Sequence, residues 1–112
     1  MTTQNITEIS HENIISTVLK LKHEGYRLVQ MCVTSAHSNY DIVYSFAHDY
    51  EFIGIRTIIS QDTEIPSISE VFPPAFLYEN EMKDLFGVKI ALISLDYNGN
   101  FYRLENKTPF NS

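Results

Sequence analysis

The chain has 112 residues, enough for one core and too few for a second domain of ordinary size, so we expect a single domain spanning residues 1–112. Its 14 acidic and 8 basic residues give a formal net charge of −6, and the basic residues are scattered, which excludes nucleic acids and anionic membranes as partners. Because no apolar run approaches the roughly 18 residues of a membrane span and residues 1–13 do not resemble a signal peptide, we expect a cytoplasmic protein without direct membrane insertion.

The first predicted element is an amphipathic helix over residues 11–24. Ser10 precedes it as a possible N-cap, and Gly25 supplies a stop. Its apolar residues recur at helical spacing: Ile14, Ile15, Val18 and Leu19. One side of this helix should therefore pack on a core.

Three runs rich in apolar and β-branched residues follow, at 26–34, 40–48 and 52–59. The middle run alternates strictly between apolar and smaller or polar side chains, which is typical of a strand with one buried face. The connections are short and favour an antiparallel meander. The single cysteine, Cys32, lies in an apolar stretch, and we expect it to be a small buried side chain.

The next segment contains three prolines, Pro66, Pro73 and Pro74, and cannot be a regular strand. Within it, Ser67 and Glu70 have the spacing of a capping box that starts one short turn. A second helix is predicted over residues 74–86, closed by Gly87.

A strand is predicted over residues 89–96, and Asn98-Gly99 indicates a hairpin leading into residues 101–104. The predicted fold class is α+β. An N-terminal helix packs on an antiparallel sheet of three or more strands, followed by a Pro-rich loop, a second helix and a C-terminal β-hairpin.

The sequence contains no Gly-rich phosphate loop, internal repeat or Cys/His cluster with metal-ligand spacing. The four histidines are isolated from one another, and a single cysteine cannot hold an iron–sulfur cluster that needs four protein ligands. We therefore predict no catalytic residues, no cofactor and no metal site.

The acidic residues of the second helix form the one cluster that invites a functional interpretation. At about 100° per residue, the apolar face should contain Tyr78, Met82, Leu85 and Phe86. Glu79 and Lys83 are then expected on the far side as an ordinary surface ion pair.

Glu81 and Asp84 are neighbours at i and i+3 on the border of that apolar face. Two like charges held close together destabilise a helix unless something positive meets them, so both are candidates for contacting an Arg, a Lys or a backbone N–H on another surface. Plain surface charge, a hard-metal site and general acid–base catalysis are the alternatives. No fuller ligand set, nucleophile or pocket is visible in the sequence to support the last two.

The segment Ile65 to Val88, with Phe72-Pro73, Ala75, Glu79, Glu81 and Asp84-Leu85-Phe86-Gly87-Val88, resembles the signature of the thirty-kilodalton subunit family of respiratory complex I, an NADH dehydrogenase. Two departures matter. Asn80 stands where that signature has Arg, and the chain lacks a C-terminal motif like Gly-His-Pro-Leu-Arg-Lys-Asp. Both the length and the tail are similar to the small homologous subunit of Ech-type energy-converting [NiFe]-hydrogenases.

The resemblance implies a non-catalytic scaffold subunit that binds no cofactor and packs beside a large [NiFe]-hydrogenase-like subunit and a small iron–sulfur subunit. Carried over at matching positions, the subunit-interface residues would be Glu79, Glu81, Asp84, Phe86 and Gly87. The complex would lie at the inner face of the cell membrane and hold this chain peripherally through its partners. The alternatives are a free-standing α+β binding or regulatory module and an autonomous enzyme that uses carboxylates or a metal.

Overall fold

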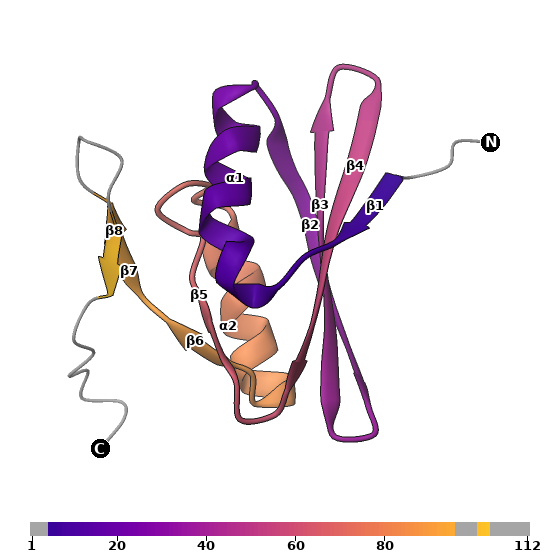
Figure 1. The fold of residues 1–112 in the computed structure, drawn as a ribbon, viewed down its shortest axis with the longest axis vertical. Coiled ribbons are helices and arrows are strands. Elements are labelled where there is room, and N and C mark those ends of the chain that lie inside the picture. Colours follow the sequence, from indigo (N-terminus) through magenta and orange to yellow (C-terminus); the bar gives the residue numbers. More distant parts are fainter. Residues whose placement is uncertain (1–4, 96–100, 104–112) are drawn as a thin grey trace.

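The computed structural model describes residues 5–95 and 101–103, and its largest sheet has four strands in the order β1-β4-β3-β2 and forms one side of the molecule (Figure 1). The strands are β1 Asn5–Glu8, β2 Arg27–Ala36, β3 Asn39–His48 and β4 Glu51–Ser60. β2, β3 and β4 form the predicted antiparallel meander. β1, which the sequence analysis did not predict, pairs with β4 in parallel. The predicted α+β fold class is confirmed.

The meander turns are tight and use left-handed backbone conformations. His37 and Ser38 join β2 to β3 with φ of 52° and 72°, and Asp49 begins the turn between β3 and β4 with φ of 54°. Two successive residues with positive φ match the twist of a two-residue hairpin. Each of the three strands is one or two residues longer than predicted, because pairing continues up to the two-residue turns.

The N-terminal helix is a short 3-10 turn, η1 His11–Asn13, that continues into α1 Ile14–His23. The predicted N-cap is correct, since the Ser10 hydroxyl accepts a hydrogen bond from the Glu12 N–H at 3.3 Å. Gly25 follows the helix with φ of 95°. The buried residues are Ile14, Ile15, Val18 and Leu21, so Leu21 is buried where Leu19 is only partly covered.

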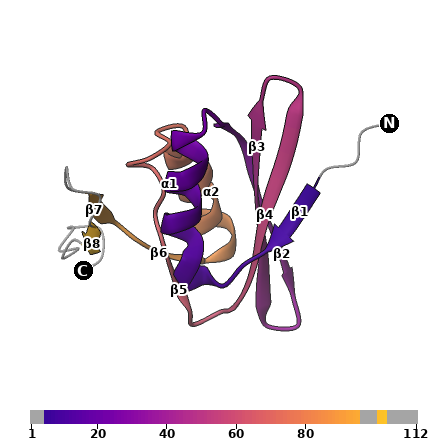
Figure 2. The same cartoon turned by 45° about the horizontal axis from the view of Figure 1, so that its top comes forward.

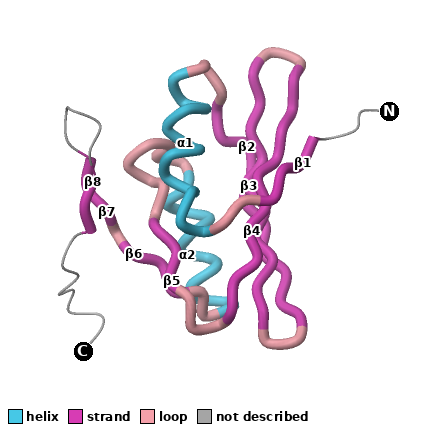
Figure 3. The backbone as a smooth tube through the Cα atoms, in the orientation of Figure 1, coloured by secondary structure: helices cyan, strands magenta, loops and turns pink. Residues whose placement is uncertain are grey.

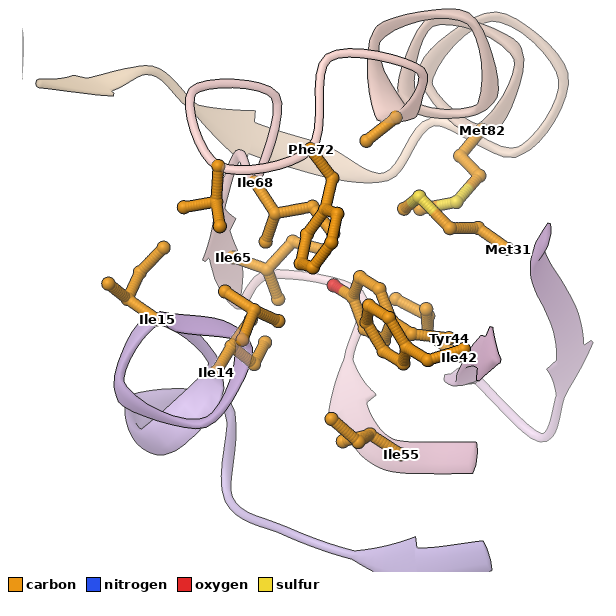
Figure 4. Packing of buried hydrophobic residues seen from close by; sticks show 14 of the residues in the cluster. Ile14, Ile15, Met31, Ile42, Tyr44, Ile55, Ile65, Ile68, Phe72 and Met82 are labelled. Carbon is orange, nitrogen blue, oxygen red and sulfur yellow. The ribbon is translucent and has the colours of Figure 1, made fainter. Parts of the chain in front are cut away.

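Both α-helices cover the same face of the four-stranded sheet (Figure 2). The core between them is built from the alternating side chains of β3, with Ile42, Tyr44 and Phe46 fully buried. Ile65, Ile68 and Phe72, from the Pro-rich loop and the strand before it, pack against these side chains (Figure 4). The rings of Phe46 and Phe72 lie 5.2 Å apart between centroids. The Pro-rich segment is therefore part of the core.

The second half of the chain is a crossover that carries α2 Ala75–Phe86 (Figure 3). It begins in β5 Glu64–Pro66, passes through α2 and returns in β6 Lys89–Ala91, which pairs with β5 in parallel. The bounds of α2 agree with the prediction. The predicted strand over residues 89–96 is interrupted at Leu92.

A separate antiparallel pair follows, made by β7 Ile93–Leu95 and β8 Phe101–Arg103. This confirms a C-terminal hairpin arrangement, although the Asn98-Gly99 turn lies outside the described residues. Among the described helices, none has the length and apolar character needed to span a bilayer.

The prediction that Cys32 is buried is wrong. Cys32 is exposed and pairs with Val43 of β3, on the opposite face of the sheet from Tyr44 and Ile42. β2 is an edge strand and no helix covers that face in the described part of the chain, so its outward-pointing residues remain open to solvent. The apolar residues next to Cys32 in the sequence do not determine on which face of the strand its side chain lies.

Candidate functional site

Helix α2 is fixed at both ends by its sequence. Pro74 stands at the N-cap with φ of −58°, where a missing N–H costs nothing, and Gly87 closes the helix with φ of 78°. Its N–H donates to the Lys83 carbonyl. Because glycine has no Cβ and adopts this left-handed conformation readily, the end of the helix is set locally.

Two tyrosine hydroxyls attach α2 to the meander. The Tyr78 hydroxyl donates to the Val29 carbonyl of β2 at 3.1 Å. At the other end of the helix, the Tyr40 hydroxyl of β3 donates to the Phe86 carbonyl. Together these bonds hold α2 alongside the edge of the sheet.

Glu79 is not a surface residue, and the predicted ion pair with Lys83 is wrong. Only 5% of Glu79 is exposed. The Ser67 hydroxyl donates to its Oε1 at 2.6 Å, and the Ile68 N–H donates to its Oε2 at 2.8 Å. Ser67 Oγ also accepts the Ser69 N–H at 3.2 Å, and the predicted short turn is present, since the Val71 N–H donates to the Ile68 carbonyl. The Ser67 N–H donates to the Ala91 carbonyl, so the reciprocal bond of a capping box with Glu70 is not formed. Glu79 therefore ties the Pro-rich loop to α2.

The surroundings of Glu79 and of Tyr44 shift the pKa values of both side chains. Burial raises the pKa of the Glu79 carboxyl, while the bonds from Ser67 and Ile68 and the charge of Lys83 act in the opposite direction. The pKa of the Tyr44 phenol is also raised, first by its complete burial and then by the negative charge of Glu79. The Tyr44 hydroxyl has no hydrogen-bond partner among the described residues. Both groups are thus held in their protonated forms more strongly than in water.

The face of α2 that enters the core matches the predicted one only in part, since Met82 is buried and Tyr78 packs against the core as predicted. The buried residues are Ala75, Glu79 and Met82, spaced at i, i+4 and i+7. Met82 lies beside Met31 of β2 (Figure 4), but Leu85 is 70% exposed and Phe86 is 40% exposed. The prediction that Leu85 and Phe86 point into the core is therefore wrong. The carboxylate of Glu79 lies on the buried face of α2, whereas the spacing of apolar residues alone placed it on the exposed face.

The remaining predicted interface residues lie on the outer part of α2 and at its end. Glu81, Asp84 and Gly87 are exposed, and neither carboxylate forms an ion pair in the described part of the chain. Glu81 and Asp84 are one turn apart, beside Leu85 and Phe86. The result is a surface that combines two free negative charges with uncovered apolar side chains.

A groove of about 310 Å³ separates α2 from β2. One wall is Gln30, Met31, Cys32 and Val33, and the other is Tyr78, Glu81, Met82, Leu85 and Phe86. This groove was not predicted from the sequence, because its two walls are about 50 residues apart in the chain. The contribution of Ser67 was missed for a similar reason, since no local pattern links it to Glu79.

The described residues contain no group of three or more His, Cys, Asp or Glu side chains that could hold a metal ion. Glu81 and Asp84 are two carboxylates on an open surface, and Glu79, bonded to Ser67 and Ile68, is not available to join them. This arrangement suits contact with a positively charged surface better than catalysis.

Comparison with known sequences gives a consistent picture. The model of one family, described as the respiratory-chain NADH dehydrogenase 30 Kd subunit, matches residues 7–91. An NADH-quinone oxidoreductase subunit from Ruegeria pomeroyi is 33% identical over 78 residues, which cover 62% of this chain and 39% of the relative. The corresponding subunit from a Jannaschia species is 38% identical over 56 residues, 48% of this chain and 27% of the relative. The chain thus spans well under half of the length of these relatives.

Among solved structures, the fold matches a chain of the membrane-bound sulfane sulfur reductase, an archaeal respiratory membrane complex. The TM-score is 0.70 at 18% sequence identity, over 80% of this chain and 59% of that chain. At this level of identity the match supports the fold alone.

Proposed function

The chain belongs to the family of the 30 Kd subunit of respiratory-chain NADH dehydrogenase, and on that premise we propose that it is a non-catalytic scaffold subunit of a membrane-associated redox complex. That complex is an NADH dehydrogenase-like enzyme or an energy-converting hydrogenase. The chain docks to a large [NiFe]-hydrogenase-like subunit and a small iron–sulfur subunit, and these partners keep it at the inner face of the cell membrane.

The observation that carries this proposal is the outer surface of α2. Glu81 and Asp84 are exposed without a partner in the described chain, and Leu85 and Phe86 beside them are uncovered. Leaving like charges adjacent and apolar side chains in water both cost free energy in the isolated domain. A partner with a basic and partly apolar surface removes both costs, which is the composition expected of a docking site.

Glu79, on the buried side of α2, holds the helix that carries this surface in place. Its bonds to Ser67 and Ile68 hold the Pro-rich loop against α2, so the helix is a rigid element. Gly87 closes the helix just beyond Phe86. In this proposal Glu81, Asp84 and Phe86 contact the partner, while Glu79 and Gly87 position them.

The test is co-purification of the tagged full chain from native membranes under gentle extraction, with the bound chains identified by mass spectrometry. The wild type should bring large and small redox subunits. The double reversal Glu81→Lys with Asp84→Lys should reduce their recovery at least tenfold while circular dichroism shows an unchanged fold, because both side chains are exposed.

A matched control is Glu12→Lys with Glu24→Lys, which makes the same change in net charge at exposed positions around α1. It should leave recovery close to that of the wild type. If the wild type brings no redox subunit, the proposed function fails and a free-standing binding module becomes the better interpretation. If both double variants lose the partners equally, net charge rather than the α2 surface controls assembly.

A further inference from the structure

The groove between α2 and β2 exposes the edge of a strand. Its first wall consists of four consecutive residues, Gln30 to Val33. Since successive side chains of a strand point to opposite faces, a wall made of four consecutive residues must include the strand's edge. β2 is the last strand in the sheet order, and no other described strand pairs with its outer side. Its outward N–H and C=O groups are available for a further strand.

The second wall is a continuous stripe of the helix. Its residues recur at helical spacing: Tyr78, Glu81, Met82, Leu85 and Phe86. Along this stripe the floor is apolar, with Met82 only 3% exposed and Met31 only 6% exposed, and Glu81 supplies one negative charge at the rim.

The two tyrosine bonds mark the ends of the groove. Tyr78 holds the beginning of α2 to Val29, just before the strand wall starts. Tyr40 holds the end of α2 at Phe86, and Tyr40 pairs across the sheet with Ser35, two residues after the strand wall ends. Helix α2 is thus fixed to the meander on both sides of an open interval, by Val29 of β2 at one end and by Tyr40 of the neighbouring β3 at the other, and the groove is preformed in the free chain.

We propose that this groove takes an extended segment of a partner subunit, which adds as a strand to the edge of β2 and places a basic side chain on Glu81 and an apolar one on Leu85. The inference rests on the proposed function and specifies how the partner docks. At about 3.3 Å per residue, the four residues of the strand wall match a segment of about four or five residues. Backbone bonds to β2 supply affinity, and the side-chain contacts supply specificity.

Charge identifies the occupant as a basic segment from a different chain. Glu81 lines the groove, and Asp84 is exposed three residues further along the same helix. A second copy of this chain has the same net charge of −6. In a two-fold arrangement it would bring the same acidic helix to the same groove. A Lys or Arg on a foreign segment meets these carboxylates directly.

Residue-resolved hydrogen exchange tests the backbone pairing, on the isolated full chain and on the complex purified through a tagged copy of it. In the complex, alternate N–H groups within residues 30–33 should exchange at least tenfold more slowly than in the isolated chain, because alternate N–H groups of a strand face its outer edge. An assembled complex with unchanged exchange in β2 would refute the groove inference and leave the proposed function standing. Protection already present in an isolated chain that sediments as a dimer would identify a second copy as the occupant and also refute it.

A matched pair of variants tests the side-chain contacts. Leu85 lines the groove and is 70% exposed, while Leu77, on the same helix, is 73% exposed and does not line it. Leu85→Lys should lower recovery of the partner subunits at least tenfold, because it adds a positive charge where a basic segment is to bind. Leu77→Lys should leave recovery within about twofold of the wild type. Equal effects of the two variants, or no effect of either, would contradict docking in this groove.

Discussion

The residue with the most unusual environment is Glu79, a carboxylate on the inner face of a helix. Both of its oxygens accept hydrogen bonds from the Pro-rich loop, one from a hydroxyl and one from a backbone N–H. A buried charge is tolerated only when such donors meet it. The same loop also buries Ile68 and Phe72 in the core. The loop is therefore held against the rest of the domain both by the hydrogen bonds to Glu79 and by apolar packing.

Because it is buried, Glu79 makes a contribution to the stability of the domain that depends on pH. The pKa of Glu79 in the folded state is raised above its unfolded value, which for glutamate is about 4.3. The folded state therefore binds the proton more tightly than the unfolded state. The stability contributed by this preference is complete below the unfolded pKa and is lost as pH rises through the folded pKa.

Glu79→Gln isolates this effect, because the amide keeps the shape and does not titrate. The free energy of unfolding of the wild type, relative to that of Glu79→Gln, should decrease as pH rises from about 4 towards neutrality. Urea denaturation of both proteins at each pH measures this difference. A difference that grows with pH would show that the bonds from Ser67 and Ile68 outweigh burial.

At the scale of elements, the sequence predicts best what is decided locally. The bounds of α2 follow from Pro74 and Gly87, whose backbone preferences do not depend on the rest of the fold. The meander was predictable because its connections are short and β3 alternates strictly. β1 was missed because its four residues show no alternation and its partner, β4, is more than 40 residues away.

The orientation of α2 about its axis is a tertiary property and was predicted incorrectly. Periodicity placed the carboxylate of Glu79 outside and Leu85 inside, but the loop donors of Ser67 and Ile68 favour the opposite arrangement. The same limitation applies to Cys32, whose face depends on pairing with β3. Of the candidate site, the acidic pair was found from sequence, whereas the groove beside it depends on the position of β2.

This orientation predicts a contrast between two residues of α2. Met82→Ala should reduce the free energy of unfolding by about 2 to 5 kcal/mol, because the side chain is 3% exposed and its loss leaves a cavity against Met31. Leu85→Ala should change it by less than about 0.5 kcal/mol, as expected for an exposed position. Chemical denaturation of the isolated chain measures both, and a large loss for Leu85→Ala would contradict the observed facing of the helix.

At the scale of the whole molecule, α2 has one side that packs in the core and another that faces solvent and the groove. Its inner side shares a core with the meander and α1, and its outer side contributes a wall of the groove together with Glu81 and Asp84. The net charge of −6 has the same sign as these two carboxylates, so long-range attraction favours a positively charged partner. On the proposed function, a basic partner would therefore be attracted over a distance and then oriented by the two carboxylates.

The rate of association with the partner subunits should consequently fall as salt is added, because the Debye length shortens from about 10 Å at 0.1 M ionic strength to about 3 Å at 1 M. Replacing the two acids by amides, Glu81→Gln with Asp84→Gln, should flatten this dependence by removing the charges nearest the contact. Glu12→Gln with Glu24→Gln makes the same change in net charge at exposed positions in η1 and at the end of α1, outside α2, and should retain more of the slope. Stopped-flow mixing of the full chain with separately purified partner subunits measures these rates. If the two double variants show the same slope, the molecule is steered by its total charge and the α2 carboxylates have no special part in docking.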